Sequence, residues 1–146
     1  MDYRKFKDTY YIRIDKNEEI ISTILDICQK EGIASAYFTG IGGCSSAQIQ
    51  TFIPETGEFE TECIEGMLEL INITGNVVSD ENDNLFHHTH AIYSFKKDGH
   101  HELAAGHIRS TDVLYTAEIE LRPVHEGVIR RKYDEETGTG FWDFQS

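Results

Sequence analysis

The stretch DKNEEIISTILDICQKEG, residues 15–32, decides the fold class, because it is the clear helix in a chain whose other long segments resemble strands. Its apolar residues recur at helical spacing and form one stripe, made up of Ile20, Ile21, Ile24, Ile27 and Cys28. Asp15 or Asn17 is the expected N-cap. Glu18 and Glu19 bring negative charge to the first turn, and Gly32 is expected to end the helix. Such an amphipathic helix covers one face of a sheet.

The remaining long segments are rich in β-branched and aromatic residues and are predicted to be strands. They span residues 9–14, 33–40, 46–53, 58–64, 66–78, 86–95, 101–108 and 113–121. Turn sequences separate several of them, namely PETG (54–57), SDENDN (79–84) and KKDG (96–99). Neighbouring strands joined by short turns form an antiparallel sheet. The sequence therefore predicts an α+β fold with about seven strands and one main helix.

Length and charge limit the functions that this chain can have. The 146 residues fit a single domain, which is large enough to bury a core without disulfides or a structural metal. With 13 Lys and Arg against 26 Asp and Glu, the formal charge is -13, and no Lys or Arg occurs between Glu31 and Phe95. The basic residues gather near the two ends, in RKFK (4–7) and IRRKY (129–133). These clusters are short, so a solvated surface is the favoured interpretation and a nucleic-acid backbone is a poor partner.

The cysteines and the N-terminus indicate a cytoplasmic protein. Cys28, Cys44 and Cys63 are odd in number and lack CxxC spacing, which is typical of reduced thiols inside a cell. The first residues contain no apolar signal core, and no apolar run approaches the length of a membrane span. We expect no membrane partner.

The histidines of the predicted strand FHHTHAIYSF (86–95) suggest a metal site. Side chains two apart on a strand point to the same face, so His88 and His90 stand together while His87 faces the other way. An antiparallel neighbour ending in AAGHI could bring His107 beside the pair, with Gly106 leaving the site uncrowded. Three imidazoles leave a fourth position open to water, as in catalytic zinc sites. The alternative is that these are ordinary surface or core histidines.

Two other features allow a functional and a structural interpretation. The glycines of FTGIGGCSSAQI (38–49) lack the Lys-Ser/Thr of a phosphate-binding loop, so a tight bend between two strands is favoured. Glu65 and Glu69 share one parity of an apolar strand. They either face inward, where a carboxylate near a metal could move protons, or lie on a solvated face.

Taken in order, several of these motifs resemble the PPC domain (plants and prokaryotes conserved domain), which is also known from plant AT-hook nuclear proteins. The most specific are the GIG turn, the strand EGMLELINITGN, the motif HTHAIYSFKKDG and the segment AAGHIRSTDVLYTAEIEL. The resemblance covers roughly residues 10–122, and residues 123–146 form a C-terminal extension beyond it. It implies a single domain with a strongly bent, mostly antiparallel sheet and one packed helix. It also implies a homotrimer, and a divalent metal, expected to be zinc, on His88, His90 and His107.

The chain departs from the family in ways that bear on function. Prokaryotic members are labelled predicted DNA-binding proteins, but the AT-hook that enters the DNA minor groove in the plant proteins is missing here. Ala105 replaces a glycine in the usual Gly-Gly-His, which leaves the ligand His107 unchanged. In the extension, Phe141, Trp142 and Phe144 are expected to dock on their own domain or on a neighbouring subunit.

Two functions follow from the residues and the resemblance. The first is a homotrimeric binding module with a three-histidine metal site, whose partner is DNA, another protein or a small molecule. The acidic chain and the missing AT-hook argue against direct DNA contact. The alternative is a zinc-dependent enzyme acting on a small metabolite, because the PPC fold is similar to that of acetolactate decarboxylase. In that case Glu65 or Glu69 would shuttle a proton and Arg109 would orient an anion.

Overall fold

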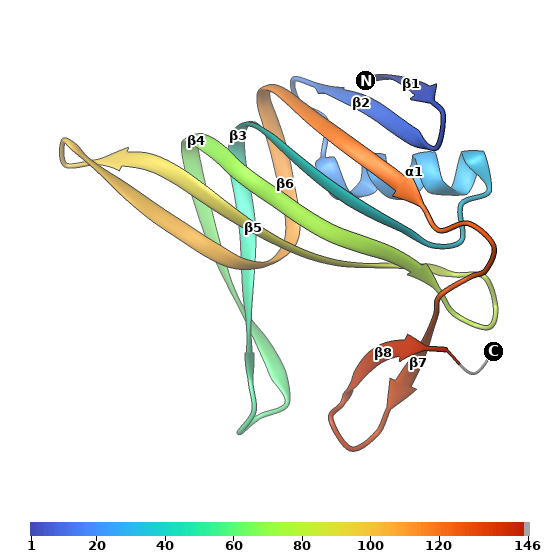
Figure 1. Ribbon diagram of the computed structural model, residues 1–146. Coiled ribbons are helices and arrows are strands. Elements are labelled where there is room, and N and C mark those ends of the chain that lie inside the picture. The colour runs from blue at the N-terminus through green and yellow to red at the C-terminus, as the bar shows by residue number, and fades with distance from the viewer. Residues whose placement is uncertain (145–146) are drawn as a thin grey trace.

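The computed structural model describes residues 1–144 and shows an α+β fold (Figure 1). Within these residues, eight strands and one helix follow one another as β1 Asp2–Phe6, β2 Thr9–Asp15, α1 Ile20–Glu31, β3 Ala36–Ile53, β4 Glu58–Ser79, β5 Leu85–Lys97, β6 His100–Pro123, β7 Arg130–Asp134 and β8 Thr139–Asp143. All strands belong to one sheet. Its pairs are antiparallel except for a single parallel contact between β4 and β7, so the sheet is mixed.

The strands differ from the predicted ones in length and number. Three long strands, β3, β4 and β6, each run through a position where two separate strands were predicted. The predicted division into two strands at the glycines of β3 is wrong, because one strand continues through the bend with irregular register around Gly40, Gly42 and Cys44. A β-bulge bends a strand without ending it. Short β1, β7 and β8 were not predicted, since their sequences alternate weakly.

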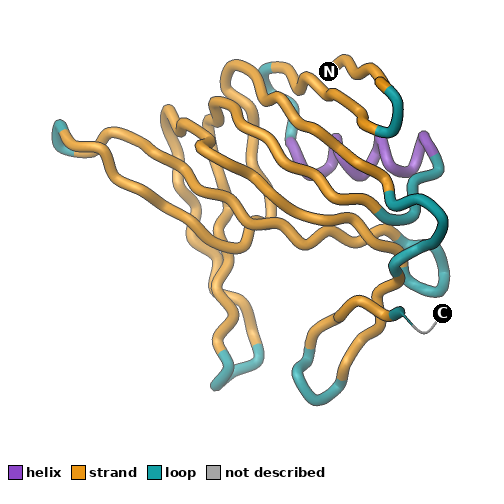
Figure 2. Tube along the Cα trace, in the orientation of Figure 1, coloured by secondary structure: helices purple, strands orange, loops and turns teal. Residues whose placement is uncertain are grey.

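The sheet closes on itself through β5. The strand order is β1-β2-β6-β3-β4-β7-β8, and β5 pairs with both β4 and β6. Strands β3, β4, β5 and β6 therefore form a closed circuit of hydrogen-bonded neighbours. Figure 2 shows these long, curved strands in orange. Beyond the last partner of β6 on β3, which is Gln50, the paired ends of β3 and β4 (residues 51–60) project as an arm, called the β3–β4 arm below (Figure 1).

Helix α1 packs on the inner face of the sheet and supplies the predicted apolar stripe. The buried residues of the helix are the five predicted ones, Ile20, Ile21, Ile24, Ile27 and Cys28. The predicted N-cap is wrong, because Glu19 holds that position and its carboxylate accepts hydrogen bonds from the amides of Ile21 and Ser22. Gly32 ends the helix as predicted, in the left-handed conformation (φ 67°). No helix in the described part of the chain is long and apolar enough to cross a membrane.

The core lies between α1 and the concave side of the curved sheet. Its fully buried members include Phe38 on β3, Leu68 and Ile73 on β4, Tyr93 on β5 and Ile119 on β6. Alternate residues of the same strands point to the opposite, outer face of the sheet. The outer face is the one that carries the candidate site.

Close backbone approach at β3 makes the bend possible. A Cβ atom on Gly42 would lie 2.6 Å from the carbonyl oxygen of Thr116 and 2.8 Å from the Cα atom of Ala117, both backbone atoms of β6. Gly75 is equally confined, with the carbonyl oxygen of His88 at 2.6 Å from its would-be Cβ. A side chain at either position would push neighbouring strands apart.

We therefore predict that Gly42→Ala lowers the free energy of unfolding by about 1–3 kcal/mol, because the added methyl group overlaps backbone that cannot move alone. Urea denaturation of the purified protein measures this change. Gly127→Ala is the matched control, since a Cβ there meets nothing within 4 Å. Equal stability of the two variants would contradict the proposed role of Gly42.

Candidate metal centre

The closed circuit of strands brings three histidines together on the outer face. His88 and His90 are alternate residues of β5, and His107 lies directly opposite His90 on β6. His107 also pairs with Gln50 of β3, so it marks the point where β6 leaves β3 and joins β5. His90 and His107 are thus cross-strand neighbours, as predicted.

The three rings are close enough to share one ion. Their potential ligand nitrogens all lie within 4.8 Å of one another. The ring centroids are 5.0 Å apart for His88 and His90, 5.3 Å for His88 and His107, and 5.6 Å for His90 and His107. Since zinc binds imidazole nitrogens at about 2.0–2.1 Å, small ring rotations would close this cluster around an ion. The donor set therefore fits a metal.

Burial and neighbouring histidines favour the neutral forms of His88 and His107. Partial burial and the neighbouring His88 and His90 lower the pKa of His107 to about 4. Burial, followed by His90, also lowers the pKa of His88. Only neutral imidazole can donate a lone pair to a metal, so at neutral pH protons compete little for His88 and His107.

Two residues next to the metal ligands, His87 and Gly106, face the inner side of the sheet. His87 faces away from the cluster as predicted, and its Nδ1 lies 3.0 Å from the hydroxyl of buried Thr89. The prediction that Gly106 leaves space at the histidine site is wrong. Gly106 pairs with Ala91 on the inner face, and a Cβ there would meet Ile49 at 2.8 Å. It makes room for the core and not for the histidines.

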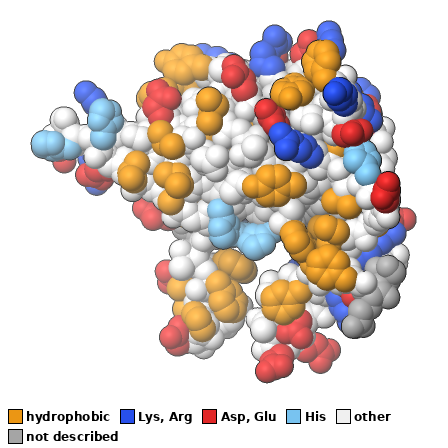
Figure 3. Space-filling view, in the orientation of Figure 1, with side chains coloured by type: hydrophobic (Ala, Val, Ile, Leu, Met, Phe, Trp, Pro, Cys, Tyr) orange, Lys and Arg blue, Asp and Glu red, His pale blue; other side chains and the backbone are white. Residues whose placement is uncertain are grey.

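A pocket of about 870 Å³ opens in front of the histidines. On one side stand Phe52 and Phe59 of the β3–β4 arm, and the Phe59 ring stacks on that of His107 at 5.6 Å. On the other side stand Phe141 and Trp142 of β8. In Figure 3, histidine side chains lie at the hollow between these two groups of hydrophobic side chains. Sequence analysis did not predict this pocket.

The second wall is the hairpin formed by β7 and β8 (residues 130–143), called the C-terminal hairpin below. The guanidinium of Arg130 donates to the hydroxyl of Ser79, the carbonyl of Asp80 and the carboxylate of Asp83 at 2.6–2.9 Å. Trp142 Nε1 donates to Asn76 Oδ1 over 3.4 Å, and Asn76 is the β4 partner of His88. The hairpin thus contacts its own domain through Arg130 and Trp142, while Phe141, Trp142 and Phe144 stay 49–75% exposed, so the expected burial of these rings is not seen within one chain.

The predicted proton carriers and the predicted anion ligand lie elsewhere. Glu65 and Glu69 are exposed on β4, opposite Ser46 and Gly43 of β3. Their solvated interpretation is therefore the one that the structure supports. Arg109 is exposed on β6. None of the three lines the pocket that contains the histidines.

Sequence reasoning missed Phe52, Phe59 and Arg131 as residues of the pocket. Phe52 and Phe59 flank the PETG turn at equal distance, which is a signal for a cross-strand pair, and their ring centroids are 5.3 Å apart. Arg131 was treated as part of a solvated basic cluster, whereas it lines the pocket. No sequence signal tells that the C-terminal hairpin folds back on β4.

Solved structures share this fold over nearly the whole chain. A protein from Bacteroides thetaiotaomicron, described as a candidate DNA-binding protein, is 26% identical with a TM-score of 0.90, over 99% of this chain and 98% of its own. A plant- and prokaryote-conserved (PPC) protein from Pyrococcus horikoshii is 29% identical with a TM-score of 0.83, over 99% and 95%. A metal-containing protein from Archaeoglobus fulgidus is 28% identical with a TM-score of 0.80, over 97% and 96%.

A more distant likeness concerns the enzyme alternative. A Staphylococcus aureus protein described as similar to alpha-acetolactate decarboxylase is 12% identical with a TM-score of 0.53, over 84% of this chain and 54% of its own. At this identity the likeness shows a shared fold alone. Among curated proteins, none matches the chain significantly. The model of the Plants and Prokaryotes Conserved (PCC) domain, the family called PPC above, matches residues 1–125, and the chain belongs to that family.

Proposed function

We propose that the protein is a metal-binding module that holds a divalent ion, zinc in our proposal, with His88, His90 and His107. The observation that carries this proposal is the cluster of three imidazoles within 4.8 Å of one another on the open face of the sheet. The metal-containing relative from Archaeoglobus fulgidus supports it. Imidazole suits zinc among the common divalent ions, and three ligands leave one position for water or a small molecule.

The apolar outer face of the sheet supports assembly as a homotrimer. Large side chains that are 41–66% exposed lie on this face, namely Tyr11, Tyr37, Ile41, Met67, Ile71 and Tyr115. A groove of about 680 Å³ runs beside Phe6, Tyr11 and Ile41. An apolar surface spread over several strands is typical of a subunit interface.

The free thiols of Cys28, Cys44 and Cys63 fit the cytoplasm, where we place the protein.

Direct DNA binding has little support in the charge distribution, although relatives are described as candidate DNA-binding proteins. The two basic clusters lie on β1 and β7, which are far apart in Figure 1. Arg4 pairs with Asp2 at 2.7 Å, and Arg130 pairs with Asp83 at 2.6 Å. With a charge of -13 on each chain, these clusters do not make a continuous basic surface. We propose that any link to DNA runs through a partner.

The enzyme alternative remains a second proposal, favoured by the open metal position and the pocket in front of it. A metal there would polarise a bound carbonyl or carboxylate. Within one chain, however, Glu65, Glu69 and Arg109 do not line the pocket. Proton transfer by these residues would therefore require that a neighbouring subunit bring them to the site.

The metal proposal predicts that the His88→Ala/His90→Ala variant loses its bound metal, because two of three ligands are gone. Elemental analysis of protein purified without added metal, and again after zinc loading, measures the difference. His101→Ala is the control, since this histidine is exposed near the β5–β6 turn outside the cluster. Equal metal content in the double variant and the wild type would refute the site.

The trimer proposal predicts that Ile41→Glu shifts the protein from trimer to monomer, because a charge would be buried without a partner at the interface. Light scattering on a sizing column gives the molar mass of each species. Val128→Glu introduces the same charge at a similarly exposed residue in the loop before β7 and should leave the mass unchanged. A monomeric wild type would rule out the assembly.

For DNA we predict no salt-sensitive affinity of the isolated protein for duplex DNA. Counterion release makes electrostatic DNA binding stronger at low salt, so a titration from low to physiological ionic strength is the sensitive test. Fluorescence anisotropy of a labelled duplex follows the binding. Affinity that rises steeply as salt is lowered would show direct contact and contradict the prediction.

A further inference from the structure

The pocket in front of the histidines has aromatic walls that suit a planar ring. The β3–β4 arm contributes Phe52 and Phe59, with the Phe59 ring inclined only 27° to that of His107. The C-terminal hairpin contributes Phe141 and Trp142, each about half exposed. Aromatic side chains left this exposed on facing walls gain area when a planar molecule fills the space between them. The volume of about 870 Å³ is that of a small-molecule site.

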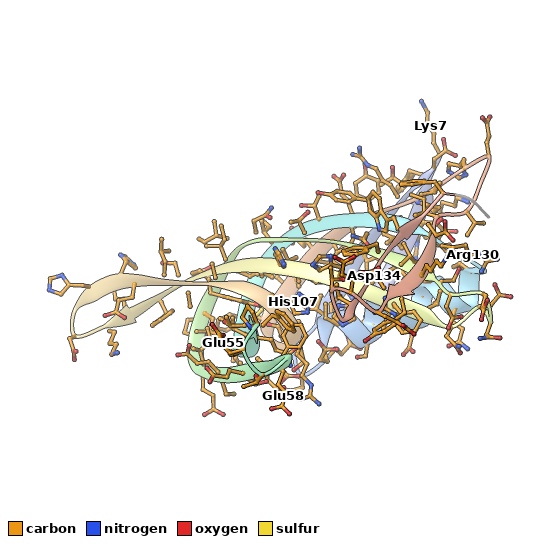
Figure 4. All side chains as sticks on the ribbon, turned by 90° about the horizontal axis from the view of Figure 1, so that it is seen from below. Lys7, Glu55, Glu58, His107, Arg130 and Asp134 are labelled. Atoms are coloured by element: carbon orange, nitrogen blue, oxygen red, sulfur yellow. The ribbon has the colours of Figure 1, made fainter. Side chains whose placement is uncertain are left out.

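The charge of this pocket is opposite to that of the chain. Among the described residues that line it, Arg131 is the single formally charged side chain, and no carboxylate is present. Figure 4 labels Glu55 and Glu58 near the end of the β3–β4 arm and Asp134 before the turn of the C-terminal hairpin, and none of these three residues lines the pocket that holds His107. At physiological salt, the interaction between exposed charges more than about 8 Å apart is largely screened. The interior therefore favours a negative group.

Arg131 is held in place by its surroundings. Its guanidinium lies over the ring of Phe86, 4.5 Å from the centroid. Across the hairpin, a Cβ on Gly140 would overlap this guanidinium, so the absence of a side chain at Gly140 creates the space for it. A stacked guanidinium keeps its edge N–H groups available, and these donors match a carboxylate in geometry.

We propose that this pocket binds a small organic anion with a planar apolar body, the body between the aromatic walls and the carboxylate attracted by Arg131 and by the metal-bound end of the pocket. The inference rests on the proposed metal site for part of its positive charge. An aromatic enclosure by itself would also suit an organic cation. Arg131 opposes that occupant, since like charges repel in a partly buried space.

Calorimetric titration of the zinc-loaded protein with benzoate, acetate and benzyltrimethylammonium separates these possibilities. Benzoate should bind, acetate should bind about tenfold more weakly or worse because it lacks the ring, and the cation should not bind. Trp142 is the one tryptophan of the chain, so a change in its fluorescence on adding benzoate locates binding at the pocket. Metal-free protein should bind benzoate more weakly than loaded protein.

Arg131→Ala should weaken benzoate binding by about tenfold, because a charge-assisted hydrogen bond is lost. Lys132→Ala is the matched control, since it removes the same charge from the next residue of β7, which does not line the pocket. Gly140→Ala should also weaken binding by displacing the guanidinium without removing its charge. Circular dichroism of each variant shows that the fold is kept.

The metal content of every sample is measured first, so the two proposals fail separately. Protein that holds zinc but does not bind benzoate, or that binds the cation instead, overturns the anion pocket and leaves the metal site standing. Protein that binds benzoate with equal affinity in Arg131→Ala and Lys132→Ala overturns the role of Arg131. Wild-type protein that holds no zinc after zinc loading overturns the metal site.

Discussion

The close backbone contact of β3 with β6 is the constraint on which the rest of the structure depends. β3 runs between β4 and β6, and Gly40 and Gly42 let β6 approach where a Cβ atom would collide with its backbone. The irregular register there bends the strands without breaking them. Because of the bend, β6 can pair with β3 along one part of its length and with β5 along another. The circuit of strands then closes.

The metal centre is a product of that closure. His107 pairs with Gln50 on one side and with His90 on the other, so it lies where the circuit is completed. A straight β6 would carry His107 along β3, away from the pair on β5. The same bend directs the β3–β4 arm past the histidines, where Phe59 stacks on His107. Site and wall thus have one structural origin.

Prediction from sequence was strongest where a period was clear. The helix stripe and the alternation of His88 and His90 follow from spacing of 3.6 and 2 residues. The approach of His107 follows from the KKDG turn, which joins two antiparallel strands. Prediction was weakest where one strand passes through an irregularity. Glycines that bend a strand look like glycines that end it, so β3, β4 and β6 were divided, and the N-cap was placed too early because Glu19 is not among the commonest capping residues.

By itself, the sequence determined the α+β class, the face of the helix that is buried, and which histidines share one face of β5. These properties are local, because they depend on the direction of side chains along a single element. Only the tertiary structure decided that the C-terminal hairpin stands beside the pocket, that Arg131 lines the pocket, and that Glu65, Glu69 and Arg109 do not. Those facts depend on the curvature of the whole sheet and on long-range contacts such as that of Arg130 with Ser79, which no local pattern records.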